Sequence, residues 1–386
     1  MSCPGCGGVS EFEGYRKVTQ VRTLVGDIVY ERAYYSCKEC HHGHCPTDQE
    51  LHLEDKQTPG FREVLTLVGV KEAFADAAEH QLSRLSGVRA SASTVRRVTE
   101  VVGEMISQVR EAGGPLQEEP RVWDWHLDAE GRKVAYMSAD MTSVSQQGPR
   151  GEKRAGRMPL VGALFNPASR TETTRRNKEI HDVHYTSGLM PLAELSQQFK
   201  TESQVVGLGQ ADIMIGMTDG GAGLEDCILD AVAGLSRETV FILDIHHVHE
   251  HLVEFAQVFC PESARKAQVS AWSTTLKERG GPPLLQELEA LDLSGRTASV
   301  IEVHRQLLGD FRHNLHRMDY PRYIKNGWQI GSGVIESACK RVIGHRLKCG
   351  GMRWREPGTN ALSHARSLYL SSDHRWEFFW SHMACG

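Results

Sequence analysis

The sequence lacks any apolar run long enough to cross a bilayer, and its first residues, MSCPGCGG, lack the positively charged start and apolar segment of a secretory signal. It also lacks internal repeats and low-complexity tracts. These absences argue against membrane-spanning, secreted and fibrous classes of protein. The 386 residues, 40% hydrophobic and 24% charged, are typical of a globular protein with two or three folded units, and we expect a cytoplasmic protein with no membrane partner.

An excess of positive charge is also lacking. Lys and Arg number 44 against 49 Asp and Glu, which gives a formal net charge of -5. Because phosphate groups are neutralised by Lys and Arg, this balance argues mildly against a nucleic-acid-binding protein. Local stretches decide such binding, however, and two segments are strongly basic, residues 149–178 and residues 340–355.

The ten cysteines are not placed like a disulfide framework, since five of them precede position 46 and the rest are scattered. Two CxxC motifs, Cys3-Pro-Gly-Cys6 and Cys37-Lys-Glu-Cys40, are separated by thirty residues. Two thiolates in a tight turn bind one ion together, and a second pair completes a tetrahedral site. We therefore predict one structural Zn²⁺ on these four cysteines, with free or redox-active cysteines as the alternative. The neighbours able to replace one cysteine ligand are His41, His42, His44 and Cys45.

The first 114 residues are expected to form two small modules. Residues 1–55 show partial alternation of apolar and polar positions between the cysteine pairs, which predicts short strands in a zinc-ribbon-like hairpin too small to fold on its own core. Residues 56–114 change to helical spacing, and Gly87 separates the last two helices, the final one capped by Ser91 or Ser93. Short helices joined by a glycine-containing turn predict a helix-turn-helix unit that binds DNA.

A Gly-Gly-Pro linker precedes the larger part of the chain. Residues 120–258 contain three strands followed by strand–helix alternation, which predicts an α/β sheet with helices on its faces. Residues 259–325 are expected to form a helical insertion with a break at Gly-Gly-Pro-Pro, and they contain no chemical motif. Residues 326–386 complete the core with a glycine-rich turn, a helix and a Trp-rich tail.

Three acidic residues occupy positions suited to metal binding. Asp140 ends the strand VAYMSAD, Asp219 ends the strand IMIGMTD before two glycines, and Glu336 lies in the first turn of a helix after GSG. Carboxylates on separate elements bridge two divalent ions about 4 Å apart, which activate a water or a 3′-hydroxyl and stabilise the leaving oxygen. Hard oxygen ligands select Mg²⁺ or Mn²⁺. Taken singly, each acid is equally a helix cap or turn former, and Asp124 and Asp128 precede Asp140 as alternatives.

These acids lie in motifs that resemble those of a known family. The segments TDGG, LDIHHVHEHL and IGSGVIESACKRVIGHRLKCGGMRW are similar to bacterial insertion-sequence transposases of the ISKra type, in the wider DDE superfamily. The resemblance covers most of the chain, from the cysteine module to the segment around Trp354, and the last segment is the most specific. It implies an α/β fold with an RNase H-like catalytic core, a mixed sheet flanked by helices. The helical insertion interrupts this core, and the zinc ribbon and helix-turn-helix unit precede it.

Carried over residue by residue, the resemblance implies that Asp140, Asp219 and Glu336 are the catalytic residues and hold two Mg²⁺ or Mn²⁺ ions. It also implies that Asp244 and His247, an Asp-x-x-His element, support this site from close by. The residues themselves leave a metal cluster, or plain packing and capping, as alternatives for this segment. Its other histidines are His246, His249 and His251.

A basic helix follows Glu336. Cations on the helix of a catalytic carboxylate would hold the DNA strand that carries the scissile phosphate, whereas charged residues on a helix normally form a solvated face. Trp354 would stack on an unpaired base or anchor the helix in the core. The predicted DNA contacts are Lys340, Arg341, Arg346, Lys348, Arg353 and Trp354.

The resemblance implies a DNA transposase, a nucleoid-associated enzyme that cleaves and transfers strands at the terminal inverted repeats of its own insertion sequence. Its partners would be double-stranded DNA, as terminal repeats and target, and further copies of itself in a homo-oligomer on that DNA. A catalytically inactive or domesticated transposase-derived DNA-binding protein is the alternative. An RNA-guided nuclease of the RuvC type fits less well, because its acids run Asp, Glu, Asp and its cysteine ribbon is inserted before the last acid.

Overall fold

The computed structural model describes residues 1–114, 116–117, 120–167, 180–221, 223–331 and 333–383. The chain divides into two compact units, Met1–Ile106 with His374–Gly386, and Ser107–Asp373. Residues 170–178, the second half of one basic stretch, lie outside the described residues. Within the described residues, no helix combines the length and apolarity needed to cross a membrane.

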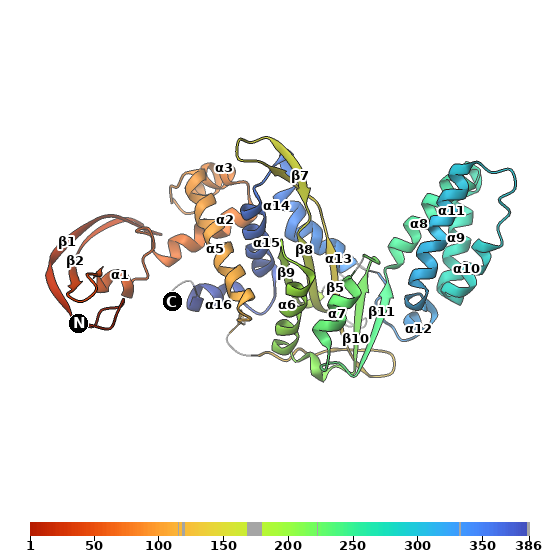
Figure 1. Ribbon diagram of the computed structural model, residues 1–386, viewed down its shortest axis with the longest axis horizontal. Coiled ribbons are helices and arrows are strands. Elements are labelled where there is room, and N and C mark those ends of the chain that lie inside the picture. Colours follow the sequence, from red (N-terminus) through yellow and green to blue (C-terminus); the bar gives the residue numbers. More distant parts are fainter. Residues whose placement is uncertain (115, 118–119, 168–179, 222, 332, 384–386) are drawn as a thin grey trace. The chain divides into compact units, whose positions relative to one another are not determined.

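A long β-hairpin begins the first unit (Figure 1). β1 (Ser10–Thr23) pairs antiparallel with β2 (Gly26–Cys37), and β3 (Gly43–His44) adds a short strand beside β2. The expected hairpin is confirmed, although its two main strands are long rather than short. Among its described side chains, the buried apolar ones are Val21 and Cys37. A two-stranded ribbon of this kind buries too little apolar surface to be stable by itself, so its ends need a further cross-link.

Helices make up the rest of the first unit. The final one expected from the sequence begins after Ser91, whose hydroxyl accepts a hydrogen bond from the Thr94 N–H at 3.2 Å. The preceding helix ends at Leu85, and Gly87, with a φ of 70°, lies in the turn between the two. Phe61, Leu82 and other apolar side chains pack between these segments. The helices are α1 (Pro46–Glu50), α2 (Pro59–Lys71), α3 (Phe74–Asp76), η1 (Ala77–Leu82), α4 (Ser83–Leu85), α5 (Ala92–Glu111), α16 (Arg375–Phe378) and η6 (Phe379–Met383).

A mixed sheet forms the centre of the second unit (Figure 1). Its strand order is β11-β10-β5-β8-β9, and β4 pairs beside the start of β5. β5, β8 and β9 are antiparallel neighbours, whereas β10 and β11 run parallel to β5. This confirms the predicted α/β sheet of three strands followed by strand–helix alternation. The strands are β4 (His126–Leu127), β5 (Lys133–Met141), β8 (Leu160–Pro167), β9 (Ile180–Gly188), β10 (Ile213–Thr218) and β11 (Glu238–Leu243).

Helices cover both faces of this sheet. α6 (Leu192–Val205) and α7 (Leu224–Val232) bury one face, where Met137 of β5 joins a core that includes Phe199 and Ile228. Successive residues of a strand point to opposite faces, so Asp140 and the other even-numbered residues of β5 face away from this core. α13 (Gly333–Ala338) packs against β5 and β8 on that second face, and α15 (Glu356–Leu370) packs against β9. The short turns η2 (Leu208–Gln210) and η3 (Leu315–Arg317) complete the unit's connections.

A bundle of helices follows β11 (Figure 1). Phe255 lies against both Trp272 and His304 in its interior, with ring centroids 5.7 and 5.2 Å away. The expected helical character of residues 259–325 is confirmed, and the break falls at Gly280, whose φ is 86°. The helices are α8 (Ile245–Phe259), α9 (Glu262–Arg279), α10 (Gly281–Glu289), α11 (Ala298–Asn314) and α12 (Tyr320–Lys325).

The glycine-rich turn after α12 returns the chain to the sheet. The Gln329 N–H donates to the Tyr136 hydroxyl at 3.3 Å, and the Ile245 N–H donates to the Ile330 carbonyl at 3.1 Å. These two bonds place the turn beside β5 and the start of α8, and α13 follows directly. Beyond it come η4 (Cys339–Gly344, a π-helix), α14 (His345–Leu347) and η5 (Cys349–Gly351).

Candidate metal centres

The four predicted cysteine ligands form one cluster at the base of the hairpin. Their sulfur atoms all lie within 4.8 Å of one another, with Cys3 Sγ 3.6 Å from Cys40 Sγ and Cys6 Sγ 3.5 Å from Cys37 Sγ. All four are free of disulfide bonds. A tetrahedral zinc ion with bonds of about 2.3 Å places its sulfur ligands about 3.8 Å apart, so the cluster fits a structural Zn²⁺ and is consistent with a zinc ribbon.

One thiol of the cluster is already disposed to ionise. Burial raises the pKa of Cys3, but hydrogen bonds from the backbone N–H groups of Gly5 and Cys6 and from neighbouring thiols outweigh burial and bring the pKa to about 6. The thiolate is the form that binds zinc. Within the described part of the chain, no neighbouring histidine joins the cluster. His44, one alternative ligand, is instead buried with its ring stacked on Tyr35.

Three aspartates follow neighbouring parallel strands of the sheet. Asp140 lies at the end of β5, Asp219 directly follows β10, and Asp244 directly follows β11. Extending the observed register of these strands by one or two residues aligns the three positions. Because neighbouring strands lie about 4.8 Å apart, the three side chains share one edge of the sheet, which we call the acidic edge.

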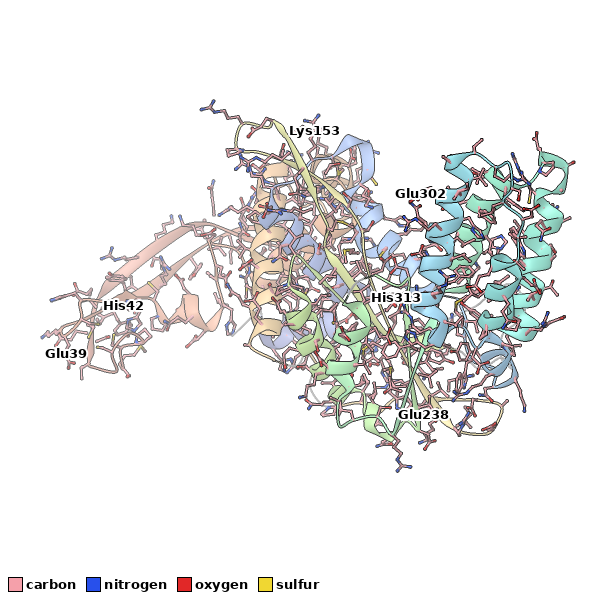
Figure 2. All side chains as sticks on the ribbon, turned by 45° about the vertical axis from the view of Figure 1, so that its right-hand side comes forward. Glu39, His42, Lys153, Glu238, Glu302 and His313 are labelled. Carbon is pink, nitrogen blue, oxygen red and sulfur yellow. The ribbon has the colours of Figure 1, made fainter. Side chains whose placement is uncertain are left out.

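The sequence alternatives to Asp140 lie elsewhere. Asp128 precedes the start of β5 and is buried, paired with Arg132 at 2.8 Å and accepting a hydrogen bond from the Trp328 indole at 3.1 Å. Asp124 precedes β4. Figure 2 labels Glu238, the first residue of β11, which marks this opposite edge of the sheet. Asp128 therefore lies at the opposite end of β5 from the acidic edge, and Asp124 belongs to the segment before β4, which pairs with the first residues of β5.

Asp140 is the most constrained acid of the edge. Its Oδ1 accepts a hydrogen bond from the Met141 N–H at 2.6 Å, and the Cys339 thiol donates to its Oδ2 at 3.5 Å. Burial raises the pKa of Asp140, and the nearby negative charges of Asp219 and Asp244 raise it further against those two hydrogen bonds. A carboxyl group crowded by like charges in this way is relieved by a cation.

Asp219 is exposed, and a feature that the sequence does not reveal lies beside it. The Gly221 N–H donates to Asp219 Oδ1 at 2.9 Å, and Gly220 takes a φ of 94°, which the turn requires. Behind this turn lies Arg317, only 2% exposed, which donates to Thr218 Oγ1 at 2.8 Å and lies 3.5 Å from Glu225. Arg317 therefore clamps the end of β10 to α7. It comes from the stretch without motifs, so only its burial identifies it.

Glu336 lies close to the acidic edge but points elsewhere. Its helix packs against β5, and Cys339, three residues further on, reaches Asp140. The Glu336 carboxylate is 62% exposed and forms an ion pair with Lys340, one turn along the same helix. Cys339 begins the π-helical segment η4, and π-turns inside helices are frequent at functional sites.

The acids do not form a closed metal site in this arrangement. Among the described residues, the four cysteines form the only group of three or more potential metal ligands whose donor atoms all lie within 4.8 Å of one another. Asp140 and Asp219, as hard oxygen donors on adjacent strands, suit Mg²⁺ or Mn²⁺. Glu336 suits the same ion only after it leaves Lys340. The structure thus brings two predicted acids and Asp244 to one edge of the sheet, and it places the third predicted acid, Glu336, on a helix that packs against β5.

The Asp-x-x-His element divides into two parts. Asp244 is buried and caps α8, accepting a hydrogen bond from the His246 N–H at 3.0 Å. The His247 ring packs edge-on against His251, with ring centroids 4.4 Å apart, and His251 lies 3.4 Å from Asp310 of α11. Asp244 thus belongs to the acidic edge, whereas His247 lies in a contact between α8 and α11.

The six predicted DNA contacts fall into two groups. Arg346 is 1% exposed, with its guanidinium 5.0 Å from the centre of the Trp354 ring, and Trp354 is 8% exposed and donates to the Leu347 carbonyl at 2.9 Å. These two side chains anchor the segment in the core, the second of the two roles weighed for Trp354. The exposed members are Lys340, Arg341, Lys348 and Arg353.

A basic hairpin extends this surface. β6 (Val144–Gln147) pairs with β7 (Lys153–Arg157), and every residue of β7 is exposed. The Trp354 backbone joins the hairpin, donating to the Ser145 carbonyl at 3.0 Å and accepting from the Gln147 N–H at 2.7 Å. Figure 2 shows Lys153 on this hairpin. The two basic stretches of the sequence, far apart in the chain, therefore meet through Trp354.

Neither the models of known protein families nor the curated protein sequences give a match to this chain.

Proposed function

We propose that this protein is a DNA transposase that cleaves and transfers DNA strands at the terminal inverted repeats of its own insertion sequence, with Asp140, Asp219 and Glu336 as catalytic residues. The observation that carries the proposal is the acidic edge, where carboxylates end neighbouring parallel strands in register beside the helix of Glu336. Two bound Mg²⁺ or Mn²⁺ ions would activate a water or 3′-hydroxyl and stabilise the leaving oxygen.

The sheet supports an RNase H-like core as the setting for this chemistry. Asp140 and Asp219 would bind the metals directly. Asp244, at the end of the next strand, would be a further ligand or would support the other two. Arg317 keeps the Asp219 turn in place, because its guanidinium is buried against Thr218 and Glu225. Fixing carboxylates on rigid strand ends is what gives a metal site its geometry.

Glu336 would act as a moving ligand. In the structure it pairs with Lys340, both side chains being more than 60% exposed, and exposed pairs of this kind are worth at most about 1 kcal/mol. A doubly charged cation at the acidic edge would attract Glu336 more strongly than Lys340 does. Its departure would free Lys340 for a DNA phosphate next to the cleaved bond.

The DNA itself would lie along the basic surface made by the exposed cations of residues 340–355 and the β6–β7 hairpin. These contacts would be to phosphates, and they would position the strand without selecting its sequence. We assign sequence recognition to the first unit, whose helices α2 to α5 include a glycine-containing turn before the last helix. Its cysteine cluster would hold the hairpin in shape for that task.

The decisive experiment uses the DNA that flanks the gene. Inverted repeats on both sides, incubated with purified protein and Mg²⁺ or Mn²⁺, should be nicked and joined by the wild type and left intact by Asp219→Asn. Asp230→Asn, an exposed acid on α7, is the matched control and should behave as wild type. Binding of the repeats without nicking or joining, identical for wild type and Asp219→Asn, would refute the enzymatic part of the proposal.

One observation favours the second candidate, a catalytically inactive DNA-binding protein derived from a transposase. Glu336 and Lys340 already satisfy each other's charge, and the acids do not form a closed group. For such a protein, Mg²⁺ would neither stabilise the fold nor alter DNA binding, and Lys340→Ala would have no effect on either. A metal-dependent rise in the melting temperature of wild type, absent in Asp219→Asn, excludes it.

A further inference from the structure

A cavity of about 710 Å³ opens between α8 and α9, on residues that take no part in the proposed chemistry. Its lining residues recur every three or four positions on each helix, so it is a groove that follows the two helix axes. The floor is apolar, made by side chains such as Val253, Val269 and Leu276, the last two buried. The volume falls within the range of pockets that bind small organic ligands, about 300–1,000 Å³.

The charge of this groove is one-sided. Arg265, Lys266 and Lys277 line it, and its lining includes no Asp or Glu, although the chain as a whole has a formal net charge of -5. Lys266 and Lys277 are exposed at the rim. His246 and His249 add flat rings to the wall, and the His249 Nδ1 lies 3.2 Å from Ser273 Oγ across the groove. An anionic ligand with flat apolar parts matches this combination.

The groove starts at the acidic edge. Its first lining residue, Ile245, directly follows Asp244, and the His246 side chain lies against Gly331 in the turn before α13. From there the lining of α8 extends to Gln257, a rise of about 18 Å along the helix. Figure 2 marks the two ends of the neighbouring helix α11 by Glu302 and His313, and the His313 end is the one nearer the sheet. A chain leaving the acidic edge would enter the groove directly.

We infer that the groove between α8 and α9 binds an unpaired DNA strand that continues from the cleaved phosphate. Single strands are held by rows of cations for the phosphates and flat or apolar platforms for the bases, which is what this groove offers. The cavity of about 710 Å³ is the size of a small-ligand pocket, so it has room for bases of one strand and not for a duplex. The identity of the ligand as DNA rests on the proposed function, whereas the groove and its charge do not.

The test measures binding of a ten-nucleotide single-stranded DNA that carries one 2-aminopurine, with full-length zinc-loaded protein in a buffer without Mg²⁺ or Mn²⁺. We expect the probe's fluorescence to be quenched as its base stacks in the groove. The double variant Lys266→Gln, Lys277→Gln should bind at least tenfold more weakly, and the slope of log affinity against log salt should fall by about 1.4, since each phosphate contact contributes about 0.7 for single strands. The control Arg279→Gln, Arg305→Gln removes two cations outside the groove and should bind within twofold of wild type.

A second variant fills the groove without changing charge. Ser270 is an exposed lining residue, and Ser270→Trp should abolish the quenching while the melting temperature stays near that of wild type. Equal weakening by the groove and control double variants, or wild-type quenching in Ser270→Trp, would overturn the inference. So would a Ser270→Trp variant that loses self-association but retains strand binding, because the groove would then seat a second copy of the chain.

The cleavage assay separates this inference from the proposed function. Asp219→Asn should bind the single strand as wild type does, although it no longer cleaves. Cleavage by a wild type that does not quench the probe would refute the groove alone. Quenching by a wild type that never cleaves terminal repeats would refute the transposase alone.

Discussion

The cysteine cluster and the acidic edge differ in how far the folded chain alone brings their donor atoms together. The four sulfur atoms come from the two ends of one hairpin and lie within 4.8 Å of one another. The carboxylates come from three strand ends and a separate helix, and Glu336 is held in an ion pair with Lys340. The four sulfur atoms are close enough together to bind one ion, whereas the carboxylates share a region of the fold without forming such a group.

This difference follows from the charges involved. Neutral thiols do not repel one another and can share hydrogen bonds, as the Cys3–Cys40 and Cys6–Cys37 pairs do, so four of them can lie close together. Burial raises the pKa of Asp140, and repulsion by the Asp219 and Asp244 carboxylates raises it further. A structural ion needs a closed site, whereas catalysis needs ligands that gather around metals and substrate together. Four changes, in order of decreasing expected effect, test whether the two sites differ in this way.

The largest effect is expected at the cysteine cluster. Cys37→Ser should lose the bound zinc and leave the β1–β2 hairpin unfolded, because apparent binding energies of structural zinc are about 10–16 kcal/mol and the hairpin has little core of its own. Metal analysis should find one zinc per chain in wild type and none in the variant, and limited proteolysis should cut residues 1–55 first. Cys349→Ser, at an exposed cysteine, should change neither. Full zinc occupancy in Cys37→Ser would show that the cluster is not the zinc site.

The next largest effect is expected at the acidic edge. Asp219→Asn should lower the rate of strand cleavage by about 10³-fold or more, as removal of one member of a cooperating catalytic set does. Its free energy of unfolding without metal should not fall, since one repulsive charge near Asp140 is removed. Single-turnover cleavage assays and denaturant unfolding without added Mg²⁺ or Mn²⁺ check the two halves. If Asp219→Asn loses activity because it unfolds, the acidic edge has a structural role like that of the cysteine cluster.

A smaller loss is expected when the turn that carries Asp219 is loosened. Arg317→Lys keeps the charge but gives up the forked contact with Thr218 and Glu225, so Asp219 should shift. Misplacement by about 1 Å costs on the order of 10²-fold in rate. The loss should appear in the rate of cleavage, with DNA affinity unchanged, and a raised metal concentration should restore part of it. Arg312→Lys, at an exposed pair on α11, is the control.

The smallest effect is a pH dependence of stability. The folded-state pKa of Asp140 is raised, so the folded protein binds its proton more tightly than the unfolded chain, whose Asp pKa is about 3.9. The free energy of unfolding should therefore fall as pH rises from about 4 through the raised pKa of Asp140. Asp140→Asn should lack this fall, and Asp230→Asn should keep it. Mg²⁺ should cancel it in wild type, and a wild type whose stability without Mg²⁺ or Mn²⁺ is flat across this range would contradict the crowding of the edge.

Local pattern was sufficient for several parts of this protein. The two CxxC motifs identified the cysteine cluster, because ligand spacing in a tight turn is a property of a few residues. The change from alternating to helical periodicity identified the sheet with its helices, and Ser91 marked the start of α5. Strand-end positions also singled out Asp140 and Asp219, since a residue that ends a strand needs only its own neighbours to be recognised.

Other features could be recognised only in the folded chain, because burial and pairing between distant segments leave no periodic signal in the sequence. Arg346 and Trp354 look like surface cation and stacking ring in the sequence, and packing buries both against each other. Arg317 carries no motif and becomes notable only through its contact with the end of β10. Asp244 aligns with two distant aspartates because three strands pair in one register. The cysteine cluster could thus be recognised in two short motifs, whereas the acidic edge exists only where separate strands meet.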